Sequence, residues 1–224
     1  MKRFKDILCA AEPGKGCKTA LERAVTLAEN NQANLTVITV VPSISAGIGM
    51  SEGDPISTEL QTKTVNSHKQ ELENLVEPYR QRIKIETRVL IGTPFLEIIR
   101  EVLRNAHDLV IKCPESLNWL DRLFSSNDKH LLRKCPCPIW MVRPQTGESF
   151  DRILAAVDVD DSYPPKELKT RQALNGMVME LASSLAMSEF AQLHVAHAWE
   201  VIGESDLRHG AFMRLPKDEV NAYV

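Results

Sequence analysis

The chain has 224 residues, of which 43% are hydrophobic and 25% are charged, the composition of an ordinary globular protein. Its net charge of −3 gives no electrostatic reason to expect nucleic acid or an anionic membrane as a partner. No apolar run approaches the length of a membrane span or of a signal-peptide core, and the five cysteines show no framework spacing. These features predict a cytoplasmic protein with reduced thiols.

Strands and helices alternate along the first part of the chain. Short apolar runs without polar alternation predict strands buried on both faces, and apolar residues at helical spacing predict helices. The predicted order is strand 7–11, helix 18–30, strand 35–41, helix 59–79, strand 83–91, a helix that begins after Gly92-Thr93-Pro94, strand 108–111, helix 127–134 and strand 138–142. This order predicts a parallel sheet with helices on both faces.

Three of these segments carry more detailed predictions. Residues 83–91 alternate apolar and polar side chains, which is typical of a strand with one exposed face near a sheet edge. Thr93 is a plausible helix N-cap, and Pro94 suits the first helical position. Residues 43–57 are rich in glycine and are predicted to form a loop.

The opening of the chain is repeated later. The residues from Phe4 to Glu12 return without a gap from Phe150 to Asp158, with Phe, Ile, Leu and Ala in register. A repeat of this length indicates a duplicated domain. We therefore expect one domain at 1–145 and an incomplete second copy at 149–224, with strands 153–158 and 192–199 around helix 168–185.

The incomplete copy has a structural consequence. Two strands and one helix bury too little surface to fold alone. This copy must lean on the first domain or pair with another chain, so we expect either an oligomer or an exposed apolar face.

The carboxyl ends of the strands are the expected place for a ligand, because parallel sheets bind ligands at that edge. Glu12, Val41 and the segment from Cys113 to Ser116 follow or end three strands there. We expect these residues to surround the mouth of a site.

Two motifs invite a more specific interpretation. The segment from Gly14 to Thr19 resembles a P-loop, but the pattern needs glycine at positions 12 and 17, where Glu12 and Cys17 stand. A flexible turn is therefore favoured over NTPase chemistry. No Gly-x-Ser-x-Gly motif for a serine hydrolase exists.

Cysteine and histidine pairs suggest metal or redox sites. Cys135 and Cys137 could form a soft-metal or redox pair, but the flanking prolines and the lack of a second ligand pair favour a structural turn. His194 and His197 are three residues apart in a predicted strand and should point to opposite faces, so packing or surface roles are favoured.

Several segments together resemble the universal stress protein family. They are Lys5-Asp6-Ile7-Leu8, Gly92-Thr93-Pro94, His107-Asp108-Leu109-Val110 and the residues from Leu131 to Val142, which include Cys135-Pro136-Cys137-Pro138. Two domains in one chain are similar to the tandem E-type members. The resemblance implies an α/β fold, with an open, doubly wound, parallel five-stranded sheet of order 3-2-1-4-5 that is adenine-nucleotide alpha-hydrolase-like. It also implies a homo-oligomer or intramolecular domain pairing through the strand from Pro138 to Val142.

The resemblance also implies where a ligand would bind. Many members bind ATP with an acid after the first strand, a backbone contact at the end of the second and a Gly-x2-Gly-x9-Gly-Ser/Thr loop after the fourth. The equivalent residues here are Glu12, Val40, Cys113, Ser116, Ser125 and Ser126, and the acid of the second copy is Asp158.

The phosphate loop of the first copy departs from this pattern. Residues 112–127 contain no glycine, and Pro114 removes a backbone donor. The loop of the second copy would lie beyond Val224. We therefore expect the first domain to have lost ATP binding, so no cofactor is expected, although ATP remains possible.

The expected function is that of a non-enzymatic stress-response protein that binds a small molecule or a protein partner. The alternative is an ATP-binding protein with weak ATPase or autophosphorylation activity. A third interpretation is a carrier of a small apolar ligand at a cluster formed by Trp119, Leu120, Leu123 and Phe124.

Overall fold

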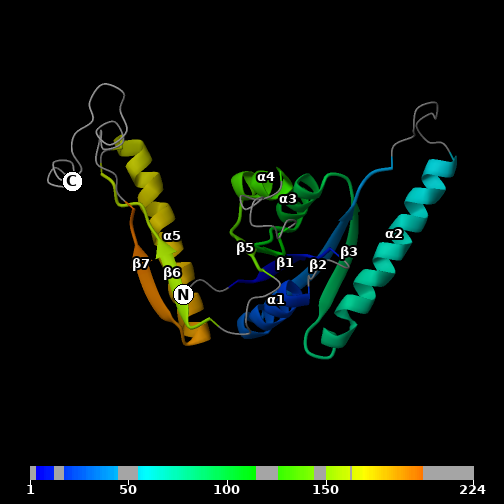
Figure 1. Ribbon diagram of the computed structural model, residues 1–224, viewed down its shortest axis with the longest axis horizontal. Helices are drawn as coiled ribbons and strands as arrows, with labels where there is room; N and C mark the ends of the chain where they lie inside the picture. The colour runs from blue at the N-terminus through cyan, green and yellow to red at the C-terminus, as the bar shows by residue number, and fades with distance from the viewer. Residues whose placement is uncertain are drawn as a thin grey trace, which may run out of the picture. The chain divides into compact units, whose positions relative to one another are not determined.

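A five-stranded parallel sheet forms the centre of the first part of the chain (Figure 1). In the computed structural model its strands are β1 (Asp6–Ala10), β2 (Asn34–Val41), β3 (Ile85–Ile91), β4 (Leu109–Lys112) and β5 (Ile139–Met141). Their order across the sheet is β3-β2-β1-β4-β5, and all neighbouring strands are parallel. The predicted order 3-2-1-4-5 is confirmed.

The structure describes residues 4–12, 18–44, 55–114, 126–143, 150–161 and 163–198. The chain divides into two units, Arg3–Gly147 and Glu148–Val224, the second together with Met1–Lys2. The helices of the first unit are α1 (Lys18–Asn31), α2 (Pro55–Val76), a short 3₁₀ helix (Glu77–Tyr79), α3 (Pro94–Asn105) and α4 (Ser126–Lys134). Within the described ranges, no helix is long and apolar enough to cross a membrane.

Strand β1 is apolar from Ile7 to Ala10 because helices cover both faces of the sheet. Ile7 and Cys9 pack into a core with α1 and α2, whereas Leu8 and Ala10 pack into a second core with α3 and α4. Successive side chains of a strand point to opposite faces, so a strand that is covered on both sides has no position for a polar residue. The two cores lie on opposite faces of one sheet.

One of two predicted elements agrees with the observed one in detail, and the other differs. β3 is an edge strand whose residues after Ile85 are half-buried or exposed, as its alternating sequence predicts. Helix α2 begins at Pro55, within the segment predicted as a loop and before the predicted start at residue 59. Proline is well tolerated at the first helical position, so it can begin this helix. Residues 45–54 lie outside the described ranges.

The second unit repeats the start of the first. It contains β6 (Arg152–Ala156), α5 (Pro165–Glu189) and β7 (Gln192–Ala196), and the two strands are parallel. Ile153 lies opposite Leu193, just as Ile7 lies opposite Leu35 in the first unit. Residues that the sequence repeat aligns therefore occupy equivalent places in the two sheets.

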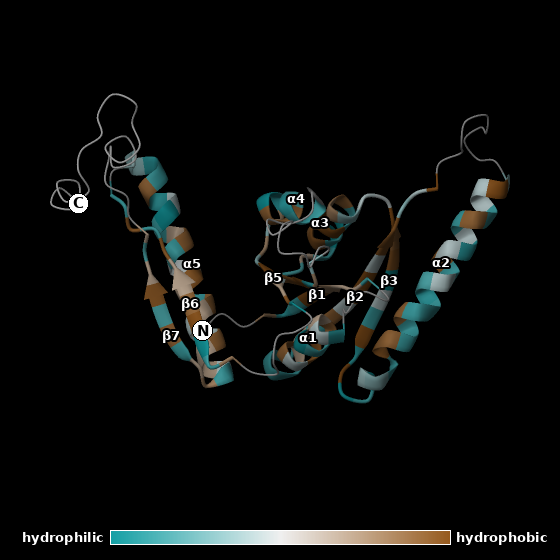
Figure 2. Ribbon diagram, in the orientation of Figure 1, coloured by the Kyte–Doolittle hydropathy of each residue, from teal (hydrophilic) through white to brown (hydrophobic). Residues whose placement is uncertain are grey.

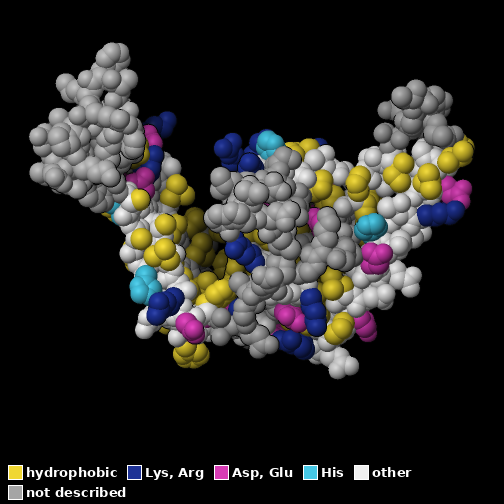
Figure 3. Space-filling view, in the orientation of Figure 1, with side chains coloured by type: hydrophobic (Ala, Val, Ile, Leu, Met, Phe, Trp, Pro, Cys, Tyr) yellow, Lys and Arg dark blue, Asp and Glu magenta, His cyan; other side chains and the backbone are white. Residues whose placement is uncertain are grey.

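Apolar side chains remain exposed in the second unit, as expected for so few elements. Leu154 is 67% exposed and Phe190 is 98% exposed. Among the described residues of this unit only Ala155 and Ala186 are buried. Figures 2 and 3 show further hydrophobic residues along α5. The expected exposed apolar face is present.

The turn from β3 into α3 requires glycine at position 92. Gly92 has a φ angle of 145°, which residues with a side chain rarely adopt, and a Cβ atom there would lie 2.8 Å from Glu97 Oε1. Thr93 occupies the N-cap and Pro94 begins the helix, as predicted, although the Thr93 side chain makes no capping hydrogen bond.

We expect Gly92→Ala to lower the free energy of unfolding by about 1–3 kcal/mol, because alanine is strained in this backbone conformation. Gly176→Ala is the matched control, since Gly176 lies within α5 and a Cβ there meets no atom within 4 Å. Alanine at this helical position should stabilise by up to about 1 kcal/mol. Urea denaturation of both variants measures the difference, and a shift of the same sign in both would contradict the prediction.

Candidate functional site

A small pocket opens at the carboxyl ends of the strands of the first unit. Its volume is about 20 Å³, which is room for roughly one water molecule. Glu12 after β1, Val40 of β2 and Lys112 at the end of β4 line it. Apolar residues, among them Ile98 of α3, form the rest of the lining.

The pocket brings together only some of the predicted site residues. Glu12 and Val40 both line it. Cys113 is 7% exposed and packs into the core on the opposite face of the sheet, so its side chain does not line the pocket. Ser126 is the first residue of α4, and Ser116 and Ser125 lie outside the described ranges. The assignment of these residues to a phosphate loop therefore stays a prediction.

A buried ion pair between Lys112 and Asp128 adjoins the pocket. Lys112 Nζ lies 2.6 Å from Asp128 Oδ1, and the two side chains are 4% and 0% exposed. β4 supplies the lysine and α4 the aspartate, so the pair joins the sheet to the helix that follows it. We did not predict this pair. The one available signal was a lysine at the end of an apolar strand.

The ion pair limits what the pocket can bind. Glu12 and Lys112 are the ionisable residues of its described lining. The Lys112 ammonium already faces a carboxylate at hydrogen-bonding distance, so an incoming anion would have to compete with Asp128 for it. The described lining therefore offers a phosphate no cation that is not already paired with a carboxylate.

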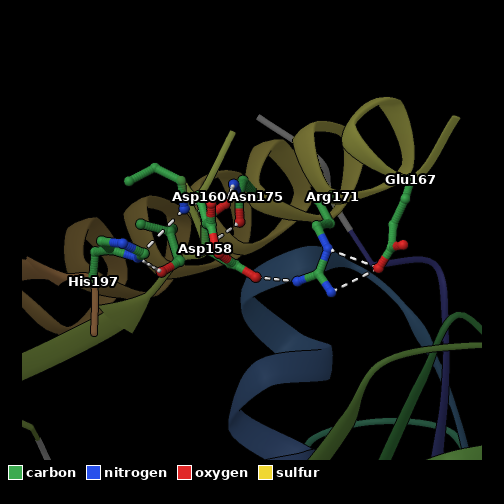
Figure 4. Close-up of polar contacts among 8 residues, drawn as sticks. Asp158, Asp160, Glu167, Arg171, Asn175 and His197 are labelled. Atoms are coloured by element: carbon green, nitrogen blue, oxygen red, sulfur yellow. Dashed lines mark hydrogen bonds and ion pairs between the residues drawn. The ribbon is translucent and has the colours of Figure 1, made fainter. Parts of the chain in front are cut away.

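The second unit places Asp158 in a network of polar contacts after β6 (Figure 4). The Arg171 guanidinium binds the Asp158 carboxylate and donates to Glu167 Oε1 over 2.8 Å. The Arg171 guanidinium carbon also lies 3.6 Å from the centre of the Tyr163 ring. The hydrogen bond to Glu167 is the main cause that raises the pKa of Arg171, the partner of Asp158.

Two further side chains hold the backbone around Asp158. Asn175 Oδ1 accepts a hydrogen bond of 3.0 Å from Asp158 N, and Asn175 Nδ2 donates one of 2.6 Å to Asp158 O. His197 Nδ1 lies 3.1 Å from Val157 O, so this histidine makes a backbone contact at the end of the strand. The acid after β6 is thus fixed in position and already paired with arginine.

Other predicted motifs fall partly outside the described ranges. Most of the segment from Gly14 to Thr19 is among them, as is the whole cluster from Trp119 to Phe124. The Asp108 carboxylate, just before β4, accepts a hydrogen bond of 2.8 Å from Lys5 N, just before β1. No group of three or more His, Cys, Asp or Glu side chains suited to a metal occurs among the residues that the structure describes.

The sequence of residues 3–143 matches the profile of the Universal stress protein family. The chain belongs to this family. The match spans all five strands of the first unit, from β1 to β5. The universal stress protein resemblance seen in the sequence is therefore confirmed.

Several curated relatives are E-type universal stress proteins. The chain is 29% identical over 192 residues to universal stress protein E of Photorhabdus laumondii, covering 80% of this chain and 60% of the relative. It is 26% identical over 205 residues to universal stress protein E of Escherichia coli strain K12, covering 90% and 63%. The chain thus spans less than two thirds of the length of these relatives.

Solved structures share the fold. A putative universal stress protein from Pseudomonas aeruginosa UCBPP-PA14 has a TM-score of 0.66 and 22% identity, covering 98% of this chain and 68% of that one. Universal stress protein UspA from Lactobacillus plantarum has a TM-score of 0.56 and 21% identity, covering 64% of this chain and all 100% of that one.

Proposed function

We propose that the chain acts in a stress response by binding a small ligand or a protein partner, and not by catalysis. The family of the first unit and the likeness to E-type relatives support the stress-response role. The proposal includes two tandem domains, at 1–145 and 149–224. The equivalent register of β1 with β2 and of β6 with β7 supports this division.

Loss of ATP binding by the first unit is the central part of the proposal. The observation that carries this proposal is the buried ion pair of Lys112 and Asp128. Lys112 is the cation of the described pocket lining, and its ammonium group already contacts a carboxylate. A bound triphosphate needs cations and free backbone amides, for which glycine is the usual residue. The glycine-free segment 112–127 and the carboxylate of Glu12 both oppose that requirement.

We expect about 1 mM Mg-ATP to shift the thermal midpoint of the chain by less than about 1 °C. A ligand with a Kd near 10 µM would stabilise by about 2.7 kcal/mol at that concentration, or roughly 5–10 °C for a protein of this size. Differential scanning fluorimetry and equilibrium dialysis measure the effect. Adenosine is the matched control, because a shift with adenosine alone would show that the site accepts the nucleoside and rejects the phosphates.

The alternative function, ATP binding with slow hydrolysis or autophosphorylation, predicts a different result. Mg-ATP would then shift the midpoint by several degrees and release phosphate over time. Glu12→Gln and Asp158→Asn tell the two units apart, since each removes the charge of the acid that follows a first strand. Loss of the shift in Asp158→Asn alone would place the ligand in the second unit.

We also propose that two copies of the chain associate through the strand from Pro138 to Val142. β5 is the last strand of the sheet, and edge strands present unpaired backbone groups to a partner. Light scattering over a range of protein concentrations should give a mass above that of one chain, which is 25.1 kDa. A monomer at every concentration would rule out this contact.

A further inference from the structure

Two half-buried cysteines lie side by side where α4 leads into β5. Cys135 and Cys137 belong to a Cys-Pro-Cys-Pro segment, and their Sγ atoms are 3.7 Å apart. Cys9 and Cys113, in contrast, are buried in the core on the opposite face of the sheet. Among the four cysteines that the structure describes, Cys135 and Cys137 are thus the two within reach of solvent.

The surrounding fold holds both ends of this segment. Cys135 N donates a hydrogen bond of 2.9 Å to Leu131 O in the last turn of α4. Pro138 O accepts one of 3.0 Å from Val110 N of β4. Both cysteine side chains also pack against the core that α3 and α4 cover. Their approach is therefore a property of the folded protein and not only of their spacing in the sequence.

We infer that Cys135 and Cys137 form a reversible redox site that a hydroperoxide oxidises to an intramolecular disulfide. The inference goes beyond the proposed binding function and does not depend on it. A disulfide bond is about 2.05 Å long, so the two sulphur atoms must approach by less than about 2 Å. A metal is a poorer occupant, because no third suitable ligand joins the pair among the described residues.

The electrostatics assign different roles to the two thiols. The hydrogen bond with Cys137 lowers the pKa of Cys135 to about 7. The same hydrogen bond is the main cause that raises the pKa of Cys137, with burial and the charge of Asp108 acting in the same direction. Cys135 is therefore the thiolate that attacks first, since the thiolate is the nucleophile of a cysteine.

The chemistry proceeds in two balanced steps. The Cys135 thiolate attacks the hydroperoxide, the O–O bond breaks, and a sulfenic acid forms while the departing alkoxide takes up a proton to become an alcohol. The Cys137 sulphur then attacks the Cys135 sulphur, the S–O bond breaks, and the hydroxide leaves as water with the proton of Cys137. Two thiols and one hydroperoxide thus give one disulfide, one alcohol and one water. A dithiol reductant reverses the oxidation by thiol–disulfide exchange.

Peptide mapping of the full chain tests the inference. The reduced protein is treated with one equivalent of hydrogen peroxide, alkylated and digested with trypsin. Peptide 135–152 contains both cysteines and no other, because Pro144 blocks cleavage after Arg143. We expect this peptide to lose two hydrogens, to resist alkylation and to become alkylated at both cysteines after dithiothreitol. Recovery of a doubly alkylated peptide without dithiothreitol would overturn the inference, as would disulfides only between chains.

Two single variants test the order of attack. Each variant leaves a serine hydroxyl beside the remaining thiol, so the variants differ in the surroundings of that thiol, and the charge of Asp108 raises the pKa of Cys137 but not that of Cys135. A pKa of about 7 leaves about half of the Cys135 thiol ionised at pH 7, whereas the raised pKa of Cys137 leaves less than about 3% of that thiol ionised. The lower nucleophilicity of the more acidic thiol reduces this advantage. We expect Cys137→Ser to react with peroxide roughly threefold to tenfold faster. Equal rates, or a faster Cys135→Ser, in variants that retain the circular dichroism spectrum of the parent would refute the assigned order.

Discussion

Lys112→Met is expected to lower the free energy of unfolding by about 3–5 kcal/mol, because it leaves a buried charge without its counter-ion. The Asp128 side chain is fully buried, and Lys112 Nζ is 2.6 Å from its Oδ1 atom. Methionine fills a similar volume but carries no charge. Urea denaturation followed by circular dichroism measures the loss.

Two further variants show whether burial causes this loss. Lys63→Met removes a lysine that is also 2.6 Å from a carboxylate, that of Glu59, but these two side chains are 71% and 66% exposed. An exposed pair of this kind is worth about 0.5 kcal/mol or less. The double variant Lys112→Met/Asp128→Leu should recover much of the loss, although not all of it, because both residues make further polar contacts. Equal losses at positions 63 and 112 would contradict the explanation.

Arg88→Met is expected to lower the free energy of unfolding by about 2–3 kcal/mol, because it removes the cation that pairs with the buried carboxylate of Glu101. Arg88 Nη1 donates to Glu101 Oε1 over 2.6 Å, and the side chains are 35% and 2% exposed. Water can reach the site once the arginine is gone, so the loss should be smaller than at Lys112. Asn105 Nδ2 still donates to the same oxygen over 2.9 Å.

The control for this variant is Arg82→Met. Arg82 is 2.6 Å from Glu29, but the side chains are 46% and 29% exposed, so about 1 kcal/mol or less should be lost. The loss of unfolding free energy in Arg88→Lys should fall between those of Arg88→Met and Arg82→Met. Arg88 contacts both Glu86 and Glu101, and a single ammonium cannot reproduce both contacts. The hydrogen bond to Glu86 and the nearby charge of Glu101 also raise the pKa of Arg88. Chemical denaturation that ranks Arg82→Met as the more damaging change would refute this account.

Sequence patterns predicted the edge of the sheet where the site lies, but they did not predict these ion pairs. Glu12 and Val40 could be placed at one edge because the strands they follow or end are local, periodic and parallel. The orientation of the Cys113 side chain could not be predicted, because it depends on which face of the sheet the residue after Lys112 points to. Its side chain lies in the core and away from the pocket.

The sequence by itself determined the succession of strands and helices, the parallel sheet of the first unit and the repeat of its opening strand. These features arise from hydrophobic periodicity and from residues repeated in register, such as Ile7 and Ile153, and both are local properties of the chain. Local patterns predicted the ends of elements less accurately. Helix α2 begins at Pro55, whereas the predicted helix begins at residue 59.

Only the tertiary structure decided which charges meet. Lys112 and Asp128 belong to different elements, as do Arg88 and Glu101, and no sequence period relates the members of either pair. Even Cys135 and Cys137, which are close in sequence, approach because α4 and β4 hold the two ends of their segment. Contacts between elements depend on how helices pack against the sheet, and packing is a property of the whole fold.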